Sequence, residues 1–430
     1  MFISHLRLTD VRSYESADLS FQPGVTVFLG PNGYGKTNIV EAIHFLATLG
    51  SHRVASDQPL IKAGATMATI TARVQAGLAD ERSLSVAIDI RQGAPNKALL
   101  NRAPVRPREV IGAVRTVFFA PEDLAIVRGD PSERRDFIDE LITSRWPRLA
   151  GVRSEYDRVQ KQKTTLLKAM SGRSLRQAGA GAEATLAVWD QQVADLGGQI
   201  VAARLTTLAE LAPMVAAAYD AIAPVKSAAT VAYQSSSVPP DTVPDATVVS
   251  ELLAARIAER SGDEVIRGVC LVGPHRDDIG LSLGQLPVKG YASHGEGWSF
   301  ALALRLASLE LLQADGIDPI LILDDVFAEL DEHRRARVVA AMESVEQTFI
   351  TTAVERDLPA NLFAHVYAVT PGHVERVSEG DVGRIDESLT DQLHPAARQA
   401  GQSSSSELLA DRSGPIVGRE DLPFSVELLA

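Results

Sequence analysis

Eight consecutive residues near the amino terminus have the types and spacing needed to hold the phosphates of a nucleotide. They fit the pattern G-x-x-x-x-G-K-[ST] between a predicted strand and a predicted helix, which is the setting that a phosphate-binding loop requires. Glycines let backbone N–H groups wrap the phosphates, the lysine neutralises β and γ oxygens, and the threonine offers a hydroxyl to Mg²⁺. The alternative, an ordinary glycine turn, does not require these flanking elements. The predicted ATP-binding residues are Gly30, Pro31, Asn32, Gly33, Tyr34, Gly35, Lys36 and Thr37.

Two adjacent carboxylates form the second part of the predicted site. Residues 319–323 are apolar and predict a strand, and Asp324 and Asp325 follow it directly. Ligands of α/β sheets bind at the carboxyl ends of strands. We therefore predict that Asp324 holds Mg²⁺, directly or through water, and that Asp325 is the general base or positions the attacking water. Alone, such a strand is often only a buried strand that meets solvent. Together with the phosphate loop it indicates catalysis by Lys36, Asp324 and Asp325.

A serine and a glycine before a predicted helix suggest a third contact with the nucleotide. Ser293-His294-Gly295-Glu296 precedes a helix predicted over residues 299–313. The segment resembles the signature of ABC ATPases, whose serine and glycine bind the γ-phosphate held by the opposite protomer. Ser293 and Gly295 are therefore predicted to bind ATP across a dimer. The alternative is that Ser293 only caps the helix.

Two further segments bear on the class of ATPase. Residues 328–331, Ala-Glu-Leu-Asp, occupy the place of the ABC D-loop. Thr351 and Thr352 end a predicted strand where transporter ATPases have a switch histidine. The missing histidine argues against a transporter subunit and leaves Thr352 as a candidate sensor of the γ-phosphate.

The surrounding segments predict an α/β fold. Apolar runs and alternation predict strands near residues 6–8, 19–21, 25–29, 69–74, 84–90, 114–119, 320–323 and 348–352, and a helix begins within 36–46. Residues 131–223 have helical spacing and predict an arm of antiparallel helices joined near 171–182. We predict an ABC-type P-loop ATPase head, with a mixed sheet and flanking antiparallel strands, plus a helical arm subdomain. The predicted parts are ATPase lobe I (1–130), the helical arm or lobe II (131–225), the ATPase remainder (226–390) and a disordered tail (391–430).

Composition and charge restrict the function classes. The chain has 430 residues, 45% of them hydrophobic, so it can bury a large core over two or more packed units. A formal net charge of -13 excludes coating of a polyanion by the whole surface, so nucleic acid would need a local basic patch. The single Cys270 cannot form an internal disulfide. The first residues lack a secretory signal, and no stretch of about 20 uninterrupted apolar residues would span a bilayer. These features predict a cytoplasmic protein with no membrane anchor.

One segment carries the opposite charge. Residues 145–176 hold nine basic and two acidic side chains, a local net charge of +7. Phosphate contacts by such a patch position DNA without reading its sequence. A solvated helix face is an equally weighted alternative. The predicted DNA-binding residues are Arg145, Arg148, Arg153, Arg158, Lys161, Lys163 and Lys168.

The residues between these motifs resemble the bacterial RecF family over about residues 1–385. The resemblance implies a weak ATPase that forms an ATP-dependent homodimer on single-stranded, gapped or duplex DNA. It also implies action with RecO and RecR in recombinase loading, within DNA repair, replication fork maintenance and SOS induction. Two features depart from the family: Glu296-Gly297-Trp298 replace a glutamine-rich stretch, and a serine-rich tail is extra. An ionised Glu296 cannot donate a hydrogen bond as an amide does. The segments that carry the resemblance are Phe119-Ala120-Pro121-Glu122-Asp123-Leu124, Gly129-Asp130-Pro131, Arg134-Arg135-Asp136-Phe137, Trp189-Asp190 and Gly273-Pro274-His275-Arg276-Asp277-Asp278.

Three functions stay open on the sequence alone. An ATP-gated DNA clamp is favoured, a mainly non-catalytic ATP-binding scaffold is the second, and another ABC-type ATPase is the third, with a transporter subunit least favoured. Chromosome-maintenance and double-strand-break ATPases of the same superfamily need long coiled coils, and the predicted arm has under 100 residues. For residues 275–278, a salt-bridged loop that braces the ATPase lobe is favoured over contact with DNA or nucleotide.

Overall fold

The computed structural model describes residues 1–171, 180–223, 227–359, 362 and 364–377. All of them fall within the unit Met1–Val382. The tail predicted at 391–430 and most of the linker predicted near 171–182 lie outside the described residues.

Near-continuous apolar runs form a central, mostly parallel sheet. Every residue of β8, β12 and β13 is buried, as expected for strands that are covered on both faces. Only β15 runs antiparallel to its neighbour. Across the sheet the order is β15 (His373–Arg376), β14 (Ala364–Thr370), β3 (Gly24–Leu29), β13 (Gln347–Thr352), β12 (Ile320–Asp324) and β8 (Thr116–Phe119).

Strands with alternating polar and apolar residues form a second, antiparallel sheet. In β1, Leu6 and Leu8 are buried and Arg7 between them is exposed, so one face of the strand points into the core. The order is β2 (Tyr14–Ser20), β1 (Phe2–Val11), β4 (Met67–Gly77), β5 (Asp80–Arg91), β6 (Lys97–Leu100) and β7 (Ala103–Val105).

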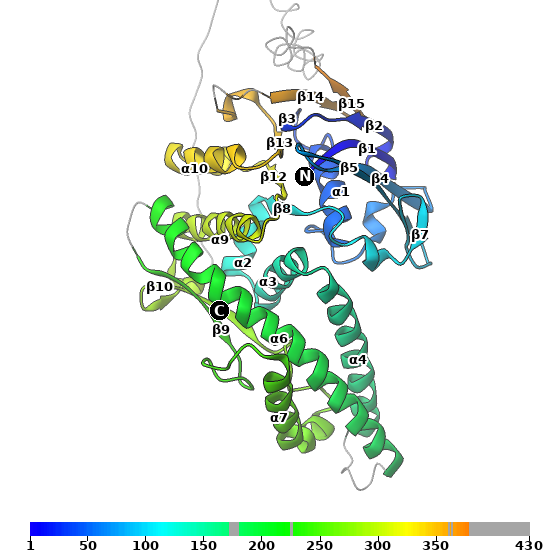
Figure 1. The fold of residues 1–430 in the computed structure, drawn as a ribbon, viewed down its shortest axis with the longest axis vertical. Helices are drawn as coiled ribbons and strands as arrows, with labels where there is room; N and C mark the ends of the chain where they lie inside the picture. The colour runs from blue at the N-terminus through cyan, green and yellow to red at the C-terminus, as the bar shows by residue number, and fades with distance from the viewer. Residues whose placement is uncertain (172–179, 224–226, 360–361, 363, 378–430) are drawn as a thin grey trace, which may run out of the picture. The chain divides into compact units, whose positions relative to one another are not determined.

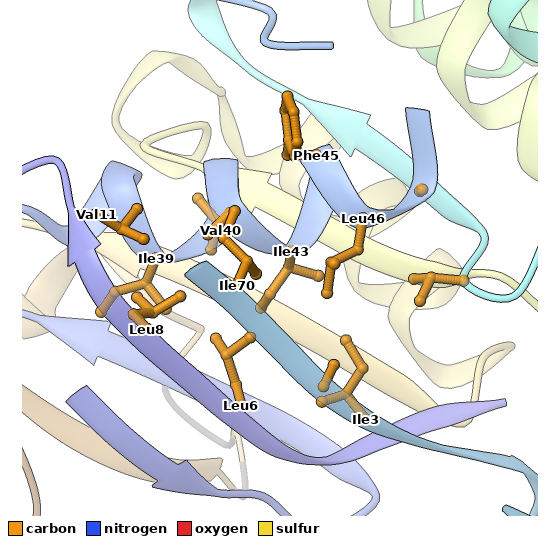
Figure 2. Close-up of a cluster of buried hydrophobic side chains, with 14 of the residues drawn as sticks. Ile3, Leu6, Leu8, Val11, Ile39, Val40, Ile43, Phe45, Leu46 and Ile70 are labelled. Atoms are coloured by element: carbon orange, nitrogen blue, oxygen red, sulfur yellow. The ribbon is translucent and has the colours of Figure 1, made fainter. Parts of the chain in front are cut away.

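Helix α1 (Lys36–Thr48) packs against both sheets and joins them into one core. Its Ile39 and Ile43 lie against Leu6 and Leu8 of β1 and Ile70 of β4, as Figure 2 shows. Because α1 follows the phosphate loop directly, this packing fixes the base of the loop on the most buried helix of the sheet region.

Long helices form the arm. The predicted helices at 131–223 are confirmed as α3, α4 and α6, and a further helix, α7, packs against α4 and α6 (Figure 1). The helical part of the chain therefore extends beyond the predicted boundary near residue 225. A glycine allows this close packing, because a Cβ on Gly198 of α6 would lie 2.5 Å from the carbonyl oxygen of Ala246. The helices are α3 (Pro131–Arg145), α4 (Arg148–Met170), α6 (Ala180–Ile222) and α7 (Ala246–Arg267).

Helix α6 is the one described helix that is long and apolar enough to cross a membrane by length and composition. Half of its most apolar window is buried inside the protein. Its contacts with α4, α7 and α9 account for these residues, because core helices satisfy the same criteria.

Shorter elements connect the arm to the sheets. The helix predicted at 299–313 begins earlier, at His294, because Ser293 caps it. A small sheet has the order β11 (Leu286–Pro287), β10 (Asp278–Leu283) and β9 (Ala229–Gln234). The remaining helices are α2 (Leu124–Arg128), α8 (Val288–Tyr291), α9 (His294–Ala314) and α10 (Glu332–Glu343), with 3-10 turns η1 (Gln58–Leu60), η2 (Pro107–Val110), η3 (Pro121–Asp123), η4 (Phe327–Glu329) and η5 (Glu355–Asp357).

The loop at residues 273–278 is salt-bridged, as the favoured interpretation predicted, but its partner is helix α3 of the arm rather than the ATPase lobe. Arg134 of α3 donates to both carboxylate oxygens of Asp278, at 2.8 and 2.9 Å. Arg204 of α6 is buried, donates twice to Asp139 at 2.8 Å, and also donates to the carbonyl oxygen of Pro274 at 2.8 Å. The Arg134–Asp278 pair fixes the start of the arm to β10, and the Arg204–Asp139 pair joins α6 to α3.

Candidate nucleotide-binding site

The phosphate loop connects β3 to α1, as its sequence predicted. Gly35 precedes α1 with a φ of 104°, in the left-handed region that favours glycine. A Cβ at this position would lie 2.7 Å from Ser13 Oγ and 2.9 Å from the Tyr14 hydroxyl. Tyr14 also donates to the carbonyl oxygen of Gly35 at 3.1 Å. The β1–β2 turn therefore supports the loop from behind, and only glycine fits there.

Lys36 is buried inside the loop that it terminates. Its Nζ donates to the carbonyl oxygens of Gly30 and Pro31, at 2.7 and 3.3 Å, and to Asn32 Oδ1 at 3.1 Å. Burial lowers the pKa of the ammonium, and the charges of Asp325 and Asp324 oppose that shift. A cation is thus held at the centre of a ring of loop oxygens, beside two carboxylates.

Asp324, at the end of β12, is joined to the loop by a threonine on each side. Its Oδ1 accepts from Thr37 Oγ1 at 3.0 Å and from Thr351 Oγ1 at 2.5 Å. Burial raises its pKa to about 6. The hydrogen bonds from the two hydroxyl groups lower this pKa, whereas the charge of the neighbouring Asp325 raises it. A hydroxyl and a carboxylate in contact are the hard oxygen donors that Mg²⁺ prefers, so Thr37 and Asp324 fit the metal site predicted for them.

Asp325 has an unusual backbone conformation, with a φ of 51°. Its N–H donates to the carbonyl oxygen of Thr351 at 3.2 Å and to the Thr351 hydroxyl at 3.0 Å. Burial raises the pKa of its carboxyl, and the charge of Lys36 opposes this. Strand β12 ends at Asp324, and the left-handed conformation begins at Asp325, so the two aspartates differ in backbone conformation and in hydrogen-bond partners.

Strand order explains why these residues meet. The neighbours β3, β13 and β12 are parallel, with Asp324 opposite Thr351 and Thr352 opposite Leu29. Their carboxyl ends therefore lie at one edge of the sheet, where α/β folds bind ligands. Lys36, Thr37, Asp324 and Asp325 come together there. Thr351 was missed as a contributor to this cluster, although a polar residue at the end of a buried strand was the available signal.

The predicted signature segment lies at the start of α9. Ser293 Oγ accepts from Glu296 N–H at 3.2 Å, and Glu296 Oε2 accepts from Ser293 N–H at 2.8 Å. This capping box shows that Glu296 is an acceptor for the backbone, and these bonds lower its pKa. Among the described residues, no hydrogen bond or ion pair joins Ser293 or Gly295 to the phosphate loop of the same chain. The capping role is present, and the role toward a second copy stays a prediction.

The remaining nucleotide-sensing candidates have local roles in the described chain. Thr352 Oγ1 donates to the carbonyl oxygen of Val354 at 3.0 Å, and Thr352 O accepts from Gly30 N–H at 3.3 Å. Asp331, at the end of the predicted D-loop, caps α10 by accepting from Arg334 N–H at 2.9 Å. Thr352 thus contacts the phosphate loop through its backbone, and its hydroxyl turns to the following loop.

Comparisons with known proteins agree with this geometry. A family model described as the RecF/RecN/SMC N terminal domain matches residues 2–375. The chain is 49% identical over 386 residues to the DNA replication and repair protein RecF of Cutibacterium acnes, with 87% of this chain and 98% of that protein covered. It is 51% identical over 379 residues to RecF of Streptomyces avermitilis, with 88% and 100% covered. This chain belongs to the RecF family.

Solved structures show that the RecF-family chain has the fold predicted for it. The structure of the recombination mediator RecF-ATPrS aligns with a TM-score of 0.78 at 24% identity, covering 88% of this chain and 98% of that one. The RecF-ATP structure aligns with a TM-score of 0.76 at 24% identity, covering 87% and 99%. A Smc head domain derived from Pyrococcus yayanosii has a TM-score of 0.52 at 15% identity, covering 91% and 99%. The ABC-type ATPase head with a helical arm is confirmed as the fold class.

The structure corrects two of the DNA-binding residues predicted for this RecF-family chain. Lys163 is fully buried and pairs with Asp190 at 2.8 Å and Glu264 at 2.7 Å, so it joins α4, α6 and α7. Arg145 is buried and pairs with Asp315 at 2.7 Å and Glu210 at 2.5 Å. A buried charge must be paired, so neither side chain is free to contact a phosphate.

The other five predicted residues lie on the surface of α4 to different degrees. Arg153 pairs with Asp136 at 2.5 Å, and Arg158 with Glu155 at 2.6 Å. Arg148, Lys161 and Lys168 are exposed, and no carboxylate of the described residues lies within ion-pair distance of them. The sequence showed correctly that this segment is basic. Helical spacing alone did not distinguish the side chains that pack against α6 and α7 from those exposed to solvent.

Thr351 is expected to be a positioning residue for turnover in the RecF-family chain. The Thr351→Val variant keeps the shape of the side chain but removes the hydroxyl that donates to Asp324 and accepts from Asp325 N–H. A hydrogen bond to a charged group contributes about 1.5–3 kcal/mol, so kcat for ATP hydrolysis should fall at least about tenfold while the ATP dissociation constant changes less than about threefold. Steady-state hydrolysis and equilibrium ATP titration measure the two effects.

The matched control is Thr351→Ser, which restores the hydroxyl without the methyl group. It should recover most of the lost kcat. If the serine and valine variants are equally impaired, packing at this buried strand end, rather than hydrogen bonding to the acidic pair, explains the defect.

Proposed function

We propose that this chain is an ATP-dependent DNA-binding protein of the RecF type, a recombination mediator whose dimerisation is driven by ATP and reset by slow hydrolysis. The observation that carries the proposal is the meeting of Lys36, Thr37, Asp324 and Asp325 at one edge of the parallel sheet. Oxygens of the phosphate loop hold Lys36, Thr37 contacts Asp324, and Thr351 contacts both aspartates. Both curated relatives are named DNA replication and repair protein RecF, which supports the choice of DNA as the ligand.

The residues of the loop would hold the triphosphate. The oxygens of Gly30, Pro31 and Asn32 now satisfy the Lys36 ammonium, and phosphate oxygens are the stronger acceptors that would exchange for them. Bound Mg²⁺ would neutralise charge on the β and γ phosphates. Asp324 and Thr37 are placed to hold it, and Asp325 is placed beside Lys36 to orient or deprotonate the attacking water.

A second copy would complete the site. Ser293 and Gly295 lie at the N-terminus of the 21-residue helix α9, where the hydroxyl, N–H groups and helix dipole favour an anion. Among the described residues they make no hydrogen bond or ion pair with the phosphate loop of their own chain, so the anion that they fit is a γ-phosphate bound by a partner protomer. This supports a homodimer with two nucleotides between its subunits.

DNA would meet the exposed basic residues of α4. Arg148, Lys161 and Lys168 remain available for phosphate contact, and Arg153 and Arg158 could exchange their exposed carboxylate partners for phosphates. The solved RecF structures are described as recombination mediators of the RecFOR pathway, which supports RecO and RecR as partners. Action in SOS induction and a cytoplasmic location are further parts of the proposal.

The proposal is tested by measuring oligomeric state and DNA affinity with and without ATP. Light scattering on the full chain should show monomer without nucleotide and dimer with ATP and Mg²⁺. Gel-shift series on single-stranded, duplex and gapped DNA should show at least about tenfold tighter binding with ATP. A chain that stays monomeric at saturating ATP and DNA would contradict the proposal.

A further inference from the structure

We infer that the DNA-binding surface extends from α4 onto the edge of the antiparallel sheet, and that its ligand is the phosphate backbone of duplex DNA. This inference rests on the proposed function and assigns to it a set of residues outside the arm. The edge–arm surface is defined by Arg102, Arg106, Arg108 and Arg115 from residues 97–115 and by Arg148 and Arg158 from α4.

The sheet edge is the second strongly basic segment of an acidic chain. Residues 97–115 contain five basic side chains and one acidic side chain, whereas the whole chain has a net charge of -13. Arg102 lies in the turn between β6 and β7, and Arg108 lies in η2. Both are exposed.

A close contact places this edge beside the start of α4. A Cβ on Gly112 would lie 2.5 Å from Cγ of Pro147, so the loop before β8 packs against the residue that precedes Arg148. Glu155, two turns along α4, has its pKa lowered by the hydrogen bond from Arg158 and by the charges of Arg158 and Arg108. Figure 1 shows the segment after β7 near the first turns of α4.

Helical spacing puts the relevant residues of α4 on the same side. Arg148 and Glu155 are seven residues apart and Arg158 follows three residues later, so the three share one face. Arg153 lies on a different face, where it pairs with Asp136, and Lys161, three residues after Arg158, lies at the border between the two faces. The edge–arm surface thus uses one face of α4, and the predicted basic residues are divided between two faces.

The acidic residues within the surface are already neutralised. Arg106 Nε donates to Glu109 at 2.7 Å, and Arg158 Nη2 donates to Glu155 at 2.6 Å. For Arg102, Arg108, Arg115 and Arg148, no carboxylate of residues 1–171, 180–223 or 227–359 lies within ion-pair distance. Arg102, Arg108 and Arg148 are exposed and Arg115 is half-buried, so the surface has a positive potential that an anionic partner would neutralise.

A DNA duplex matches the length and the fixed arrangement of these basic residues. From Arg148 to Arg158 the α4 face is about 15 Å long, at 1.5 Å per residue. Over that length a duplex presents roughly nine charges, at one per about 1.7 Å of helix axis. Arg108 and Arg148 are carried by helical turns on both sides of the Gly112–Pro147 contact, so they form a fixed array that suits a stiff backbone and reads no bases.

The double variant Arg108→Gln, Arg148→Gln tests the inference in the full chain with ATP and Mg²⁺. The slope of log affinity against log salt for a blunt duplex should fall by about 1.8, since each lost phosphate contact removes about 0.9. The gain in affinity between about 1 M and 0.1 M salt then drops roughly sixtyfold. The matched control is Arg256→Gln, Arg267→Gln, which removes the same charge from α7 and should leave the slope unchanged.

The outcomes separate this inference from the proposed function. If the wild-type chain does not bind DNA with ATP, the proposed function fails. If it binds and both double variants have the wild-type slope, the edge–arm surface is not the DNA site, and an acidic protein partner is the better occupant. A loss seen on single-stranded DNA but not on duplex would overturn the assignment to duplex. ATP affinity within about twofold of wild type confirms that the variants are folded.

Discussion

Replacing Lys36 by alanine should weaken ATP binding at least about a hundredfold and abolish ATP-dependent dimerisation and DNA retention. The ammonium is buried, and its polar partners in the described chain are oxygens of the loop itself. Removing one member of a buried charged contact costs about 3–5 kcal/mol, and each 1.4 kcal/mol is tenfold in affinity. The measurement is ATP titration by calorimetry, followed by light scattering and gel shift with ATP and Mg²⁺.

Two controls make the Lys36 result specific. Lys62→Ala removes a lysine that pairs with the exposed Glu15 on the antiparallel sheet and should bind ATP normally. Lys36→Arg keeps the charge, but its larger planar head does not fit a ring built for a compact ammonium, so it should recover little binding. A Lys36→Ala protein that still holds DNA in an ATP-dependent manner would show that the phosphate loop does not control DNA binding.

Replacing Asp325 by asparagine should reduce turnover by about 10²–10⁴-fold, the usual contribution of a general base, and should lengthen the lifetime of the ATP dimer. Asparagine has the same shape and tolerates a φ of 51° as well as aspartate does, so the turn after β12 is preserved. It cannot accept a proton from water at neutral pH. Single-turnover hydrolysis and dimer dissociation after dilution measure the two effects.

The Asp325→Asn variant also separates a hydrolysing clamp from a scaffold that binds ATP without using its hydrolysis. In a scaffold, the substitution leaves dimer lifetime and DNA retention nearly unchanged. Asp263→Asn, an exposed carboxylate of α7 paired with Arg260, is the matched control and should behave as wild type in both assays. Dimers of the Asp325→Asn chain that dissociate as fast as wild type would favour the scaffold.

Local patterns were sufficient for the parts of the site that depend on consecutive residues. The phosphate loop is recognisable because glycines at fixed positions and a lysine at a helix start are dictated by local backbone geometry, and Gly35 shows this directly with its φ of 104°. The strand ending in Asp324 and Asp325 was predictable because apolar runs of this length fit buried parallel strands. Both elements lie where their sequences placed them.

Contacts between distant residues were not predictable in the same way. Thr351 joins the site through a hydrogen bond to Asp324, 27 residues away, which depends on β12 and β13 being neighbours in register. Helix α7 follows the arm boundary that was predicted near residue 225. Its close packing on α6 involves Gly198 of that other helix, so local spacing could not predict the contact.

The sequence by itself determined the family, the nucleotide loop, the acidic strand and the basic character of residues 145–176. Only the tertiary structure decided which of those basic residues face solvent, because burial is set by neighbouring helices: Lys163 lies between Asp190 and Glu264, and Arg145 pairs with Asp315 and Glu210. The same reason applies to Arg108 and Arg148, which are 40 residues apart in the chain and become one surface through the packing of Gly112 against Pro147. Charge is a property of each residue, whereas exposure and proximity are properties of the fold.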